Sequence, residues 1–312
     1  MVLCIGTTPA AQRVMRFDKV CVNQVNRAAT TADGAAGKAV NVAKVLQTLG
    51  EKPVLTGFLG GLRGQQLAAL LKARGIEMDF VIVTAPTRQC ITVIDQSSRT
   101  VTELVQESLP VDPADYEKLT RLIQRRLKGC RAAIMSGTIT PQGPDDFYYR
   151  CTQLARDQGV LPVVDAKGPL LVEALKARPA LVKPNRSELA ATVGSELVED
   201  RDLVEAMRSL AARGAERVVV TDGPKATFAF DGVTVWRVPS PVVEAVNPIG
   251  SGDAFTAALV WSLLRGDDLG QASCFASAAG AANALTLMAG ELDLAEFQKL
   301  ARTIQPSRLE NF

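Results

Sequence analysis

The stretch Asn247-Pro248-Ile249-Gly250-Ser251-Gly252-Asp253 decides how this chain is interpreted, and the apolar run 254–260 follows it directly. Two glycines flank a serine, and the aspartate falls in the first turn of the helix that the apolar run predicts. Such a turn can direct backbone N–H groups to one point before a helix N-terminus, where the helix dipole also favours negative charge. The stretch therefore predicts an anion-binding turn.

Asp253 suggests what this turn does. A carboxylate repels phosphate, but it can accept a proton from a hydroxyl group that attacks phosphorus. The alternative is an ordinary loop in which Asp253 caps the helix, as aspartate often does. The stretch alone leaves both interpretations open, a phosphoryl-transfer centre and a helix cap.

The composition excludes several classes of function. The 312 residues are 47% hydrophobic, enough for the core of one large α/β domain or two small ones. A net charge of +2 gives no electrostatic reason to expect nucleic acid or a membrane as a partner. The absence of histidine excludes Ser-His, Cys-His and imidazole–metal mechanisms, which leaves carboxylates, lysine or bound ions for acid–base chemistry.

Two further features favour a cytoplasmic protein. The six cysteines are scattered without a C-x-x-C pair, which indicates reduced thiols. Residues 269–290 carry no charge and superficially suggest a membrane span. Small and polar residues recur through this stretch, however, which predicts a helix buried tightly inside a soluble domain.

Strand-like runs alternate with helical patterns over most of the chain, which is typical of a parallel sheet covered by helices on both faces. We expect strands at 1–6, 131–135, 160–164 and 216–220, and helices at 38–49 and from Asp112 onward. Polar runs that begin at Ser136, Asp165 and Thr221 follow the last three of these strands. Open parallel sheets hold their ligands at the carboxyl ends of the strands, so we expect the site there.

A predicted hairpin over 90–95 and 101–105 is inserted into this alternation. Together with an irregular stretch at 12–32, it would form a small β lid over the main sheet. We expect a single domain over 1–312, with lid elements at about 12–32 and 86–105. Lid strands with open edges often pair, which makes a homodimer through these strands an expectation.

Seven motifs occur in an order that resembles the PfkB family of carbohydrate kinases. They are Thr8-Pro9-Ala10, Val25-Asn26-Arg27, 37–43, Thr87-Arg88, Ser136-Gly137-Thr138, 183–189 and 247–253. The resemblance spans nearly the whole chain and is greatest to the tagatose-6-phosphate kinase and 1-phosphofructokinase branch. It implies a ribokinase-like three-layer α/β sandwich with a mostly parallel central sheet and a small β lid.

By this resemblance, Asp253 is the catalytic base and Gly250-Ser251-Gly252 form the anion hole for the transferred phosphoryl group. Asn185 and Glu188 match the N-x-x-E motif of the family, which implies that they help to hold Mg²⁺ through water. The alternative for Glu188 is an exposed acid in the first turn of a helix. The residues implied to bind nucleotide are Lys183, Asn185, Thr221, Gly223, Lys225, Gly250, Gly252 and Asn283.

The resemblance also implies a sugar site. Its residues are Gln12, Gly37, Lys38, Asn41, Arg88, Ser136 and Asp253. Lys38 and Arg88 are the candidates for binding a phosphate group already on the substrate, because a guanidinium can make two charge-assisted bonds to phosphate oxygens. Arg88 could equally be a surface charge.

The chain departs from the family pattern at both sites. Gln12 replaces an aspartate of similar kinases, and Ala36-Gly37 replace paired glycines. Glutamine can still bond a sugar hydroxyl but supplies no charge. In the nucleotide loop Asp222 replaces a leucine and Ala226 a glycine. The sequence therefore defines the identity of the sugar less well than the type of reaction.

We expect a phosphotransferase that uses ATP and Mg²⁺ to phosphorylate a ketohexose phosphate, namely tagatose 6-phosphate, fructose 1-phosphate or fructose 6-phosphate. One alternative is a kinase of an unphosphorylated sugar or a nucleoside, which Gln12 keeps open. Another is a catalytically weak sensor of sugar phosphate or nucleotide, although the intact Asp253 and N-x-x-E pattern argue against it.

Overall fold

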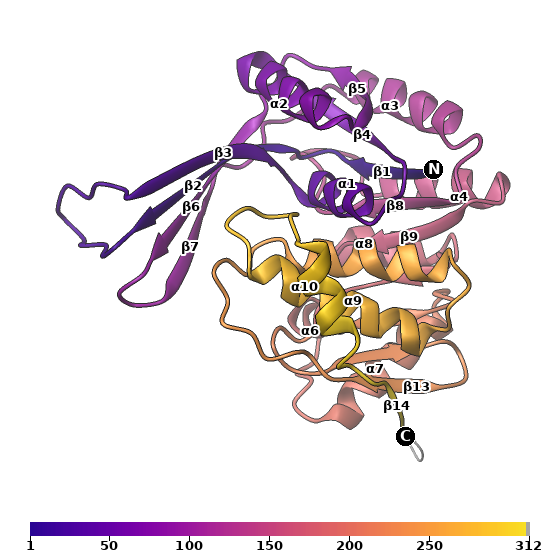
Figure 1. The fold of residues 1–312 in the computed structure, drawn as a ribbon. Helices are drawn as coiled ribbons and strands as arrows, with labels where there is room; N and C mark the ends of the chain where they lie inside the picture. Colours follow the sequence, from indigo (N-terminus) through magenta and orange to yellow (C-terminus); the bar gives the residue numbers. More distant parts are fainter. Residues whose placement is uncertain (310–312) are drawn as a thin grey trace.

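The computed structural model describes residues 1–309, in which helices cover both faces of a large sheet (Figure 1). The strands of this sheet are β1 (Val2–Gly6), β4 (Pro53–Leu59), β5 (Glu77–Ile82), β8 (Ala132–Ser136), β9 (Leu161–Asp165), β10 (Leu181–Val182), β11 (Val218–Val220), β12 (Thr227–Phe230), β13 (Val235–Val238) and β14 (Ser307–Arg308). Their order is β14-β13-β12-β11-β10-β9-β8-β1-β4-β5. Neighbours from β5 to β11 run parallel and those from β11 to β14 antiparallel, which confirms a mostly parallel sheet.

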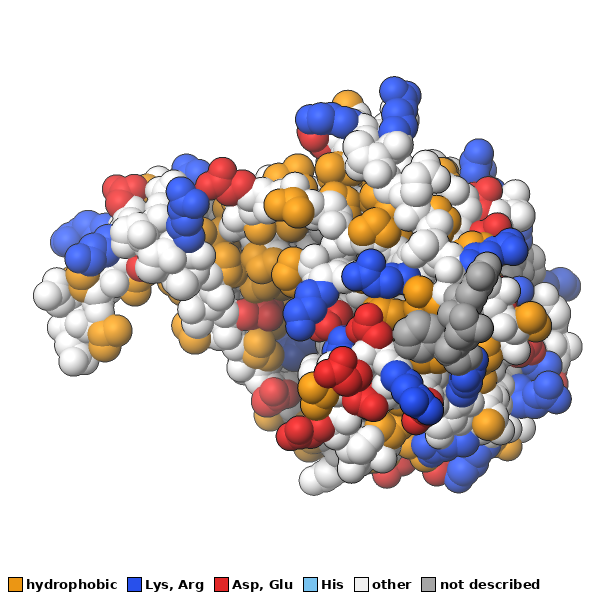
Figure 2. Space-filling view, turned by 90° about the horizontal axis from the view of Figure 1, so that it is seen from below, with side chains coloured by type: hydrophobic (Ala, Val, Ile, Leu, Met, Phe, Trp, Pro, Cys, Tyr) orange, Lys and Arg blue, Asp and Glu red, His pale blue; other side chains and the backbone are white. Residues whose placement is uncertain are grey.

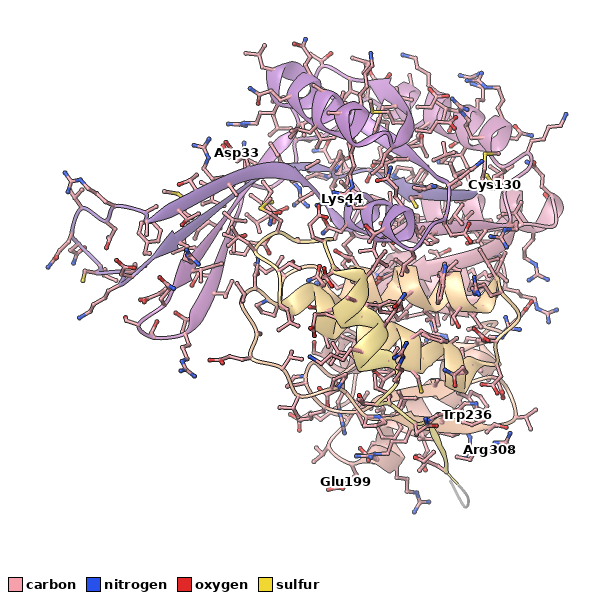
Figure 3. All side chains as sticks on the ribbon, viewed as in Figure 1. Asp33, Lys44, Cys130, Glu199, Trp236 and Arg308 are labelled. Carbon is pink, nitrogen blue, oxygen red and sulfur yellow. The ribbon has the colours of Figure 1, made fainter. Side chains whose placement is uncertain are left out.

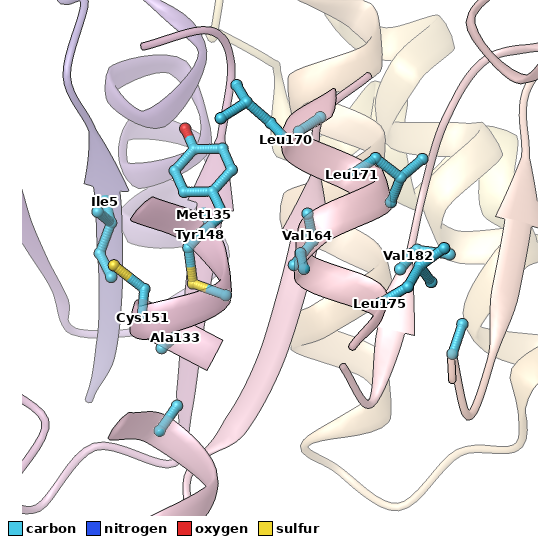
Figure 4. Close-up of a cluster of buried hydrophobic side chains, with 14 of the residues drawn as sticks. Ile5, Ala133, Met135, Tyr148, Cys151, Val164, Leu170, Leu171, Leu175 and Val182 are labelled. Carbon is cyan, nitrogen blue, oxygen red and sulfur yellow. The ribbon is translucent and has the colours of Figure 1, made fainter. Parts of the chain in front are cut away.

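The helices form two layers, each with its own apolar core. One layer contains α1 (Lys38–Thr48), α2 (Gly61–Arg74), α8 (Ser251–Leu263), α9 (Leu269–Ala284) and α10 (Leu294–Ala301). The other contains α3 (Pro113–Arg126), α4 (Phe147–Asp157), α5 (Gly168–Leu175), α6 (Arg186–Val193) and α7 (Asp200–Ala212). Side chains alternate along a strand, so Cys4 of β1 packs into the first core and Ile5 into the second, beside Met135 (Figure 4).

Local sequence signals account for several elements. Helix α3 begins where predicted, because Asp112 accepts a hydrogen bond from the amide of Ala114 at 2.8 Å and Pro113 occupies the first turn. The predicted helix within 269–290 is α9, and it packs against α8 and α10 through small, buried side chains. Among residues 1–309, no helix is both long and apolar enough to cross a membrane.

A second sheet, which we call the small sheet, projects from the body as an arm (Figure 2). Its strands, in sheet order, are β3 (Thr30–Ala36), β2 (Ala10–Phe17), β6 (Arg88–Asp95) and β7 (Thr100–Val105). The pairing of β6 with β7 confirms the predicted hairpin. The expectation of an irregular stretch at 12–32 was wrong at both ends, which belong to β2 and β3. Strand β2 pairs in parallel with β6, remote in the sequence, and β3 pairs antiparallel with β2 despite its alanine, glycine and aspartate residues.

Candidate active site

The predicted anion-binding turn lies at the N-terminus of α8, a helix of 13 residues. Gly250 is the N-cap and has a φ of +87°, a conformation that glycine adopts without strain. Asn247 fixes the preceding backbone, because its side chain accepts a bond from the amide of Ile249 at 3.1 Å and donates one to the carbonyl of Leu287 at 2.9 Å. The turn is thus held rigidly in front of the positive end of the helix dipole.

Asp253 is the third residue of α8, and the N-cap is Gly250. The alternative interpretation, in which Asp253 caps the helix, is therefore wrong. Its carboxylate is buried and accepts a bond from the side-chain amide of Asn41, on α1, at 2.7 Å. Burial is the main cause that raises the pKa of Asp253 to about 6, while Lys38 lowers it and Asp165 raises it further. A carboxylate with this pKa is ionised at neutral pH and still basic enough to accept a proton.

Asp165, the last residue of β9, links two lysines that act electrostatically on Asp253. Its carboxylate oxygens lie 3.3 Å from Lys38 Nζ and 3.3 Å from Lys183 Nζ, and one of them accepts a bond from the hydroxyl of Thr256 at 2.7 Å. Burial raises the pKa of Asp165, but Lys183 and Lys38 lower it by more, so the carboxylate remains ionised. Asp165 is also the main cause that raises the pKa of Lys38. The site therefore combines two carboxylates with two ammonium groups.

Asn185 and Glu188 form a reciprocal cap on α6. The side chain of Asn185 accepts a bond from the amide of Glu188 at 2.8 Å, and Glu188 Oε2 accepts one from the amide of Asn185 at 2.9 Å. The other oxygen, Glu188 Oε1, lies 3.9 Å from Lys38 Nζ. Glu188 is therefore half of a capping box and also faces the predicted site, rather than being only an exposed acid.

The sugar-binding residues that the sequence predicts include three buried polar atoms without a hydrogen-bond partner in residues 1–309. They are Gln12 Oε1, Asn41 Oδ1 and Ser136 Oγ. Folded proteins rarely leave such atoms unpaired, because each costs free energy. Ser136 lines a cavity together with Gly37 and Lys38. Each of the three oxygens is therefore left with unused hydrogen-bonding capacity, and their contact with a sugar stays a prediction.

Arg88 lies where the small sheet joins the body and is not a free surface charge. It is the first residue of β6, and its Nε donates to the carbonyl of Thr8 at 3.2 Å. Arg88 and Thr8 line a second cavity, and Thr8 also lines the cavity of Ser136 and Lys38. The guanidinium is therefore close to the predicted sugar site.

Comparison with known proteins identifies the family. Residues 1–293 match the family described as pfkB family carbohydrate kinase. This chain belongs to the pfkB family of carbohydrate kinases. The match confirms the resemblance seen in the motifs, and it makes the chain a phosphotransferase that acts on a sugar alcohol group.

Similar proteins cover almost the whole of this kinase. The tagatose-6-phosphate kinase of Staphylococcus epidermidis is 27% identical over 308 residues, which are 98% of this chain and 99% of the relative. A possible 1-phosphofructokinase from Thermotoga maritima has a TM-score of 0.91 and 26% identity, with 99% of each chain covered. Phosphofructokinase-2 from Escherichia coli in complex with fructose-6-phosphate has a TM-score of 0.86 and 25% identity, covering 97% of this chain and 98% of that one. The fold is the ribokinase-like α/β fold that the sequence predicts.

The predicted nucleotide loop of this kinase follows β11 and adjoins α6. Thr221 pairs with Asn185 in an isolated parallel bridge. Gly223 has a positive φ of 56°, and Lys225 is mostly exposed and lies 3.6 Å from Asp222. Asp222, an unusual residue for the family, also lies 3.3 Å from Arg186 of α6. This departure ties the loop to the helix that carries Glu188.

Asn283, a predicted nucleotide ligand, supports the anion-binding turn. It is fully buried, and its amide donates to the carbonyl of Ile249 at 3.0 Å and to the hydroxyl of Ser251 at 3.3 Å. Its carbonyl accepts a bond from the amide of Gly290 at 2.8 Å. The side chain is thus occupied within the protein, and its contact with nucleotide stays a prediction.

The contacts separate the predicted residues into groups. Lys38, Asn41, Lys183, Glu188 and Asp253 belong to one network of contacts. The nucleotide loop joins this network through Thr221 and Asn185, whereas in residues 1–309 the side chains of Gln12 and Arg88 bond to other partners. Sequence analysis missed Asp165 as a member of this network. The available signal was its place as the first polar residue after a buried strand.

Proposed function

We propose that this kinase transfers the γ-phosphoryl group of ATP to a hydroxyl group of a ketohexose phosphate. The substrate would be tagatose 6-phosphate, fructose 1-phosphate or fructose 6-phosphate, and the products a ketohexose bisphosphate and ADP. The observation that carries the proposal is the buried carboxylate of Asp253 beside the Gly250-Ser251-Gly252 turn, with a pKa of about 6. This arrangement supplies both a base and a binding point for phosphoryl oxygens.

In the proposed reaction, a sugar hydroxyl attacks the γ-phosphorus and gives its proton to Asp253. A bond forms between the hydroxyl oxygen and phosphorus, and the bond from phosphorus to the β–γ bridging oxygen breaks, with its electron pair leaving on ADP. The transferred group carries charge on its outer oxygens, which the amides of the turn stabilise. Asn41 holds the carboxylate of Asp253 in place through the bond of 2.7 Å.

The residues around Glu188 fit a magnesium ion held mainly by phosphates and water. Mg²⁺ prefers oxygen ligands and keeps several waters, and Glu188 Oε1 is the carboxylate oxygen that the capping box leaves unused. Residues 1–309 contain no group of three or more acidic, cysteine or histidine side chains that could hold a metal ion by themselves. Asn185 Oδ1 already accepts bonds from Ser187 and Glu188, so we assign the water-mediated role to Glu188. When bound, Mg²⁺ would neutralise charge on the ATP phosphates.

A phosphate group on the acceptor is supported by two observations. Arg88 lines the cavity next to that of Lys38 and Ser136. The relatives covering nearly all of the chain are described as a tagatose-6-phosphate kinase and as a phosphofructokinase bound to fructose-6-phosphate. We therefore propose that Arg88 binds the acceptor phosphate, with Lys38 contributing charge.

The second candidate is a kinase of an unphosphorylated sugar or nucleoside. The ammonium of Lys38 already lies 3.3 Å from Asp165 and 3.9 Å from Glu188, so its charge is balanced within the protein. Gln12 adds no charge to the site. If Lys38 keeps these partners when substrate binds, Arg88 alone would have to recognise the phosphate.

ADP release with Mg-ATP tests these candidates on a panel of tagatose 6-phosphate, fructose 1-phosphate, fructose 6-phosphate, fructose, ribose and adenosine. Turnover confined to the phosphorylated ketohexoses supports the proposal. Turnover only on the free sugars or the nucleoside supports the second candidate. Binding of sugar phosphate or nucleotide without turnover on any acceptor would instead indicate a sensor.

Replacing Arg88 with alanine separates the two kinase candidates. We expect Arg88→Ala to raise the KM for the phosphosugar about 10- to 100-fold, because a charge-assisted bond to phosphate is lost. The matched control is Arg13→Ala, since Arg13 is also on the small sheet but pairs with Asp33 at 2.7 Å on an exposed face. A KM that Arg88→Ala leaves unchanged would contradict the phosphate-binding role.

We also propose that the small sheet acts as a lid and pairs with a second copy of the chain. Strands β3 and β7 form its two edges, and Leu104 and Val105 of β7 are about half exposed. Pairing of such edges would bury these side chains. Light scattering of the wild type and of Leu104→Glu would test this homodimer.

The six cysteines are free thiols, which suits a cytoplasmic location.

A further inference from the structure

Lys44 is a buried lysine that the predicted reaction does not use. It lies on α1, three residues after Asn41, a spacing at which side chains are neighbours on a helix. Its side chain is only 5% exposed. Figure 3 shows Lys44 where the strands of the small sheet join the body. A charged group in such a place needs partners, and its partners indicate its role.

Three oxygen atoms from different parts of the fold surround Lys44 Nζ. It donates to the carbonyl of Ala289 at 2.6 Å and to the carbonyl of Ala35, on β3, at 3.3 Å, and it lies 3.1 Å from the carboxylate of Glu291. Ala35 belongs to the small sheet, whereas Ala289 and Glu291 follow α9. One ammonium group therefore joins the small sheet to the segment 285–291, which we call the support turn.

The support turn packs against the anion-binding turn. A Cβ atom on Gly250 would lie 2.9 Å from both Ala289 Cβ and the amide nitrogen of Gly290, so the two backbones are in close contact. The amide of Gly290 donates to Asn283, whose side chain in turn donates to the carbonyl of Ile249. The position of Ala289 and Gly290 thus determines where Gly250 can lie.

The support turn also contacts the small sheet directly. A Cβ atom on Gly34 of β3 would lie 2.5 Å from the terminal methyl group of Met288. Lys44 adds a polar link next to this contact, through the carbonyl of Ala35. Two residues after Ala35, β3 has ended and Gly37 is the N-cap of α1, the helix that carries Lys38 and Asn41.

We propose that Lys44 is a positioning residue that holds the support turn between the small sheet and the anion-binding turn, so that Gly250 is correctly placed for phosphoryl transfer. Lys44 acts through Ala289 and Ala35 and does not touch the reacting atoms. This inference rests on the proposed kinase function, since it assigns Lys44 a task in that reaction.

The variant Lys44→Met tests this role, because it keeps most of the apolar stem and removes the ammonium group. Misplacement of one anion-hole donor slows chemistry more than it weakens binding, so we expect kcat per active site to fall about 10- to 100-fold. The KM values for ATP and sugar should change by less than about threefold, as for an interaction made mainly in the transition state. Lys44→Arg, which keeps a charged donor, should recover most of kcat.

Arg74→Met is the matched control for lost stability. Arg74 contacts the support turn at the carboxylate of Glu291, 2.7 Å away, and also bonds to Gln47 and Thr48, whereas Lys44 bonds in addition to the backbone carbonyl of Ala289 beside Gly250. We expect this variant to lose stability with kcat per folded site unchanged. A Lys44→Met enzyme that keeps the wild-type kcat per folded site would overturn the proposal.

Hydrogen exchange provides a readout that does not depend on the substrate. We expect amides in 286–290 and 247–254 to exchange faster in Lys44→Met than in the wild type, and to keep wild-type rates in Arg74→Met. Unchanged exchange in both segments would overturn the role of Lys44. If the wild type phosphorylates no acceptor, the proposed function fails, and exchange alone decides whether Lys44 holds the turn.

If Lys44→Met does not fold, Met288→Ala tests the same link between the support turn and the small sheet. We then expect a lower kcat and faster exchange of the amides in 247–254. Wild-type values of both quantities would contradict the proposal.

Discussion

Helices α6 and α8 carry an acid at the same position and use it differently. Glu188 is the third residue of α6, and Asp253 is the third residue of α8. At this position an acid commonly folds back to cap its own helix. Glu188 does so, since its carboxylate accepts a bond from the amide of Asn185. Asp253 instead accepts a bond from Asn41 on another helix.

The N-cap residue explains this difference. Asn185 has a side chain that completes a reciprocal cap with Glu188. Gly250 has none, and its positive φ of 87° turns the backbone so that no side-chain cap forms on α8. Asp253 is therefore not needed as a cap, and burial raises its pKa to about 6. An acid at the third helical position becomes available as a base when the cap is glycine and a remote partner holds the carboxylate.

The same acid-to-amide change at both helices should have unequal effects, with the larger loss at α8. We expect Asp253→Asn to lower kcat about 10³-fold, because the group that accepts the hydroxyl proton is removed. ATP binding should remain, since the turn and Asn247 are intact. Steady-state kinetics and calorimetric titration with ATP would measure both quantities. Near-normal turnover in Asp253→Asn would remove the functional distinction between the helices.

The pH dependence sharpens this comparison. Asp253 must be ionised to accept a proton, so kcat/KM should fall about tenfold per pH unit below a pH of about 6. Asp253→Asn should lose this acidic limb.

A pKa raised from 3.8 to about 6 in the folded protein also means that ionising Asp253 costs stability as the pH rises through 6. Above that pH the variant should therefore be more stable than the wild type, and equal stability there would contradict a raised pKa.

Glu188→Gln should have the smaller effect. Glutamine keeps an oxygen that can accept the bond from the amide of Asn185 but loses the charge that faces Lys38. We expect kcat to fall about tenfold or less and more Mg²⁺ to be needed for half-maximal activity, with thermal stability nearly unchanged. Activity measured against Mg²⁺ concentration would show this.

The control for that variant is Asn185→Ala, which removes the side-chain half of the cap. Loss of an N-cap costs about 1 kcal/mol of unfolding free energy. Glu188→Gln could lose as much stability as Asn185→Ala and keep the wild-type Mg²⁺ requirement. That result would show that Glu188 acts only as a helix cap.

Local signals explain why much of the fold could be predicted. The proline and aspartate at the start of α3, the uncharged small residues of α9 and the turn before α8 all act within a few residues of one another. Strands β2 and β3 were harder to recognise, because β3 contains alanine, glycine and aspartate. Strand β2 pairs with β6, more than seventy residues away, and β3 pairs in turn with β2.

The candidate site divides in the same way. The motif order pointed to Asp253, Lys38 and Asn41, but only the structure brings Asn41 within 2.7 Å of Asp253. Asp165 was recognisable as a polar residue after a buried strand, whereas its pairing with Lys38 and Lys183 was not. Asn283 was predicted as a nucleotide ligand, and its buried contacts with the anion-binding turn depend on how α9 packs against α8.

The sequence by itself determined the helix starts, the buried strands and the glycine turn before Asp253, because these depend on backbone conformation and on contacts between near neighbours. It also determined the family, through the order of the motifs. Only the tertiary structure decided that Asp253 is buried and bonded to Asn41, because that depends on side chains far apart in the chain. The pKa of Asp253 follows from this packing, since burial and Lys38 act through space and not along the sequence.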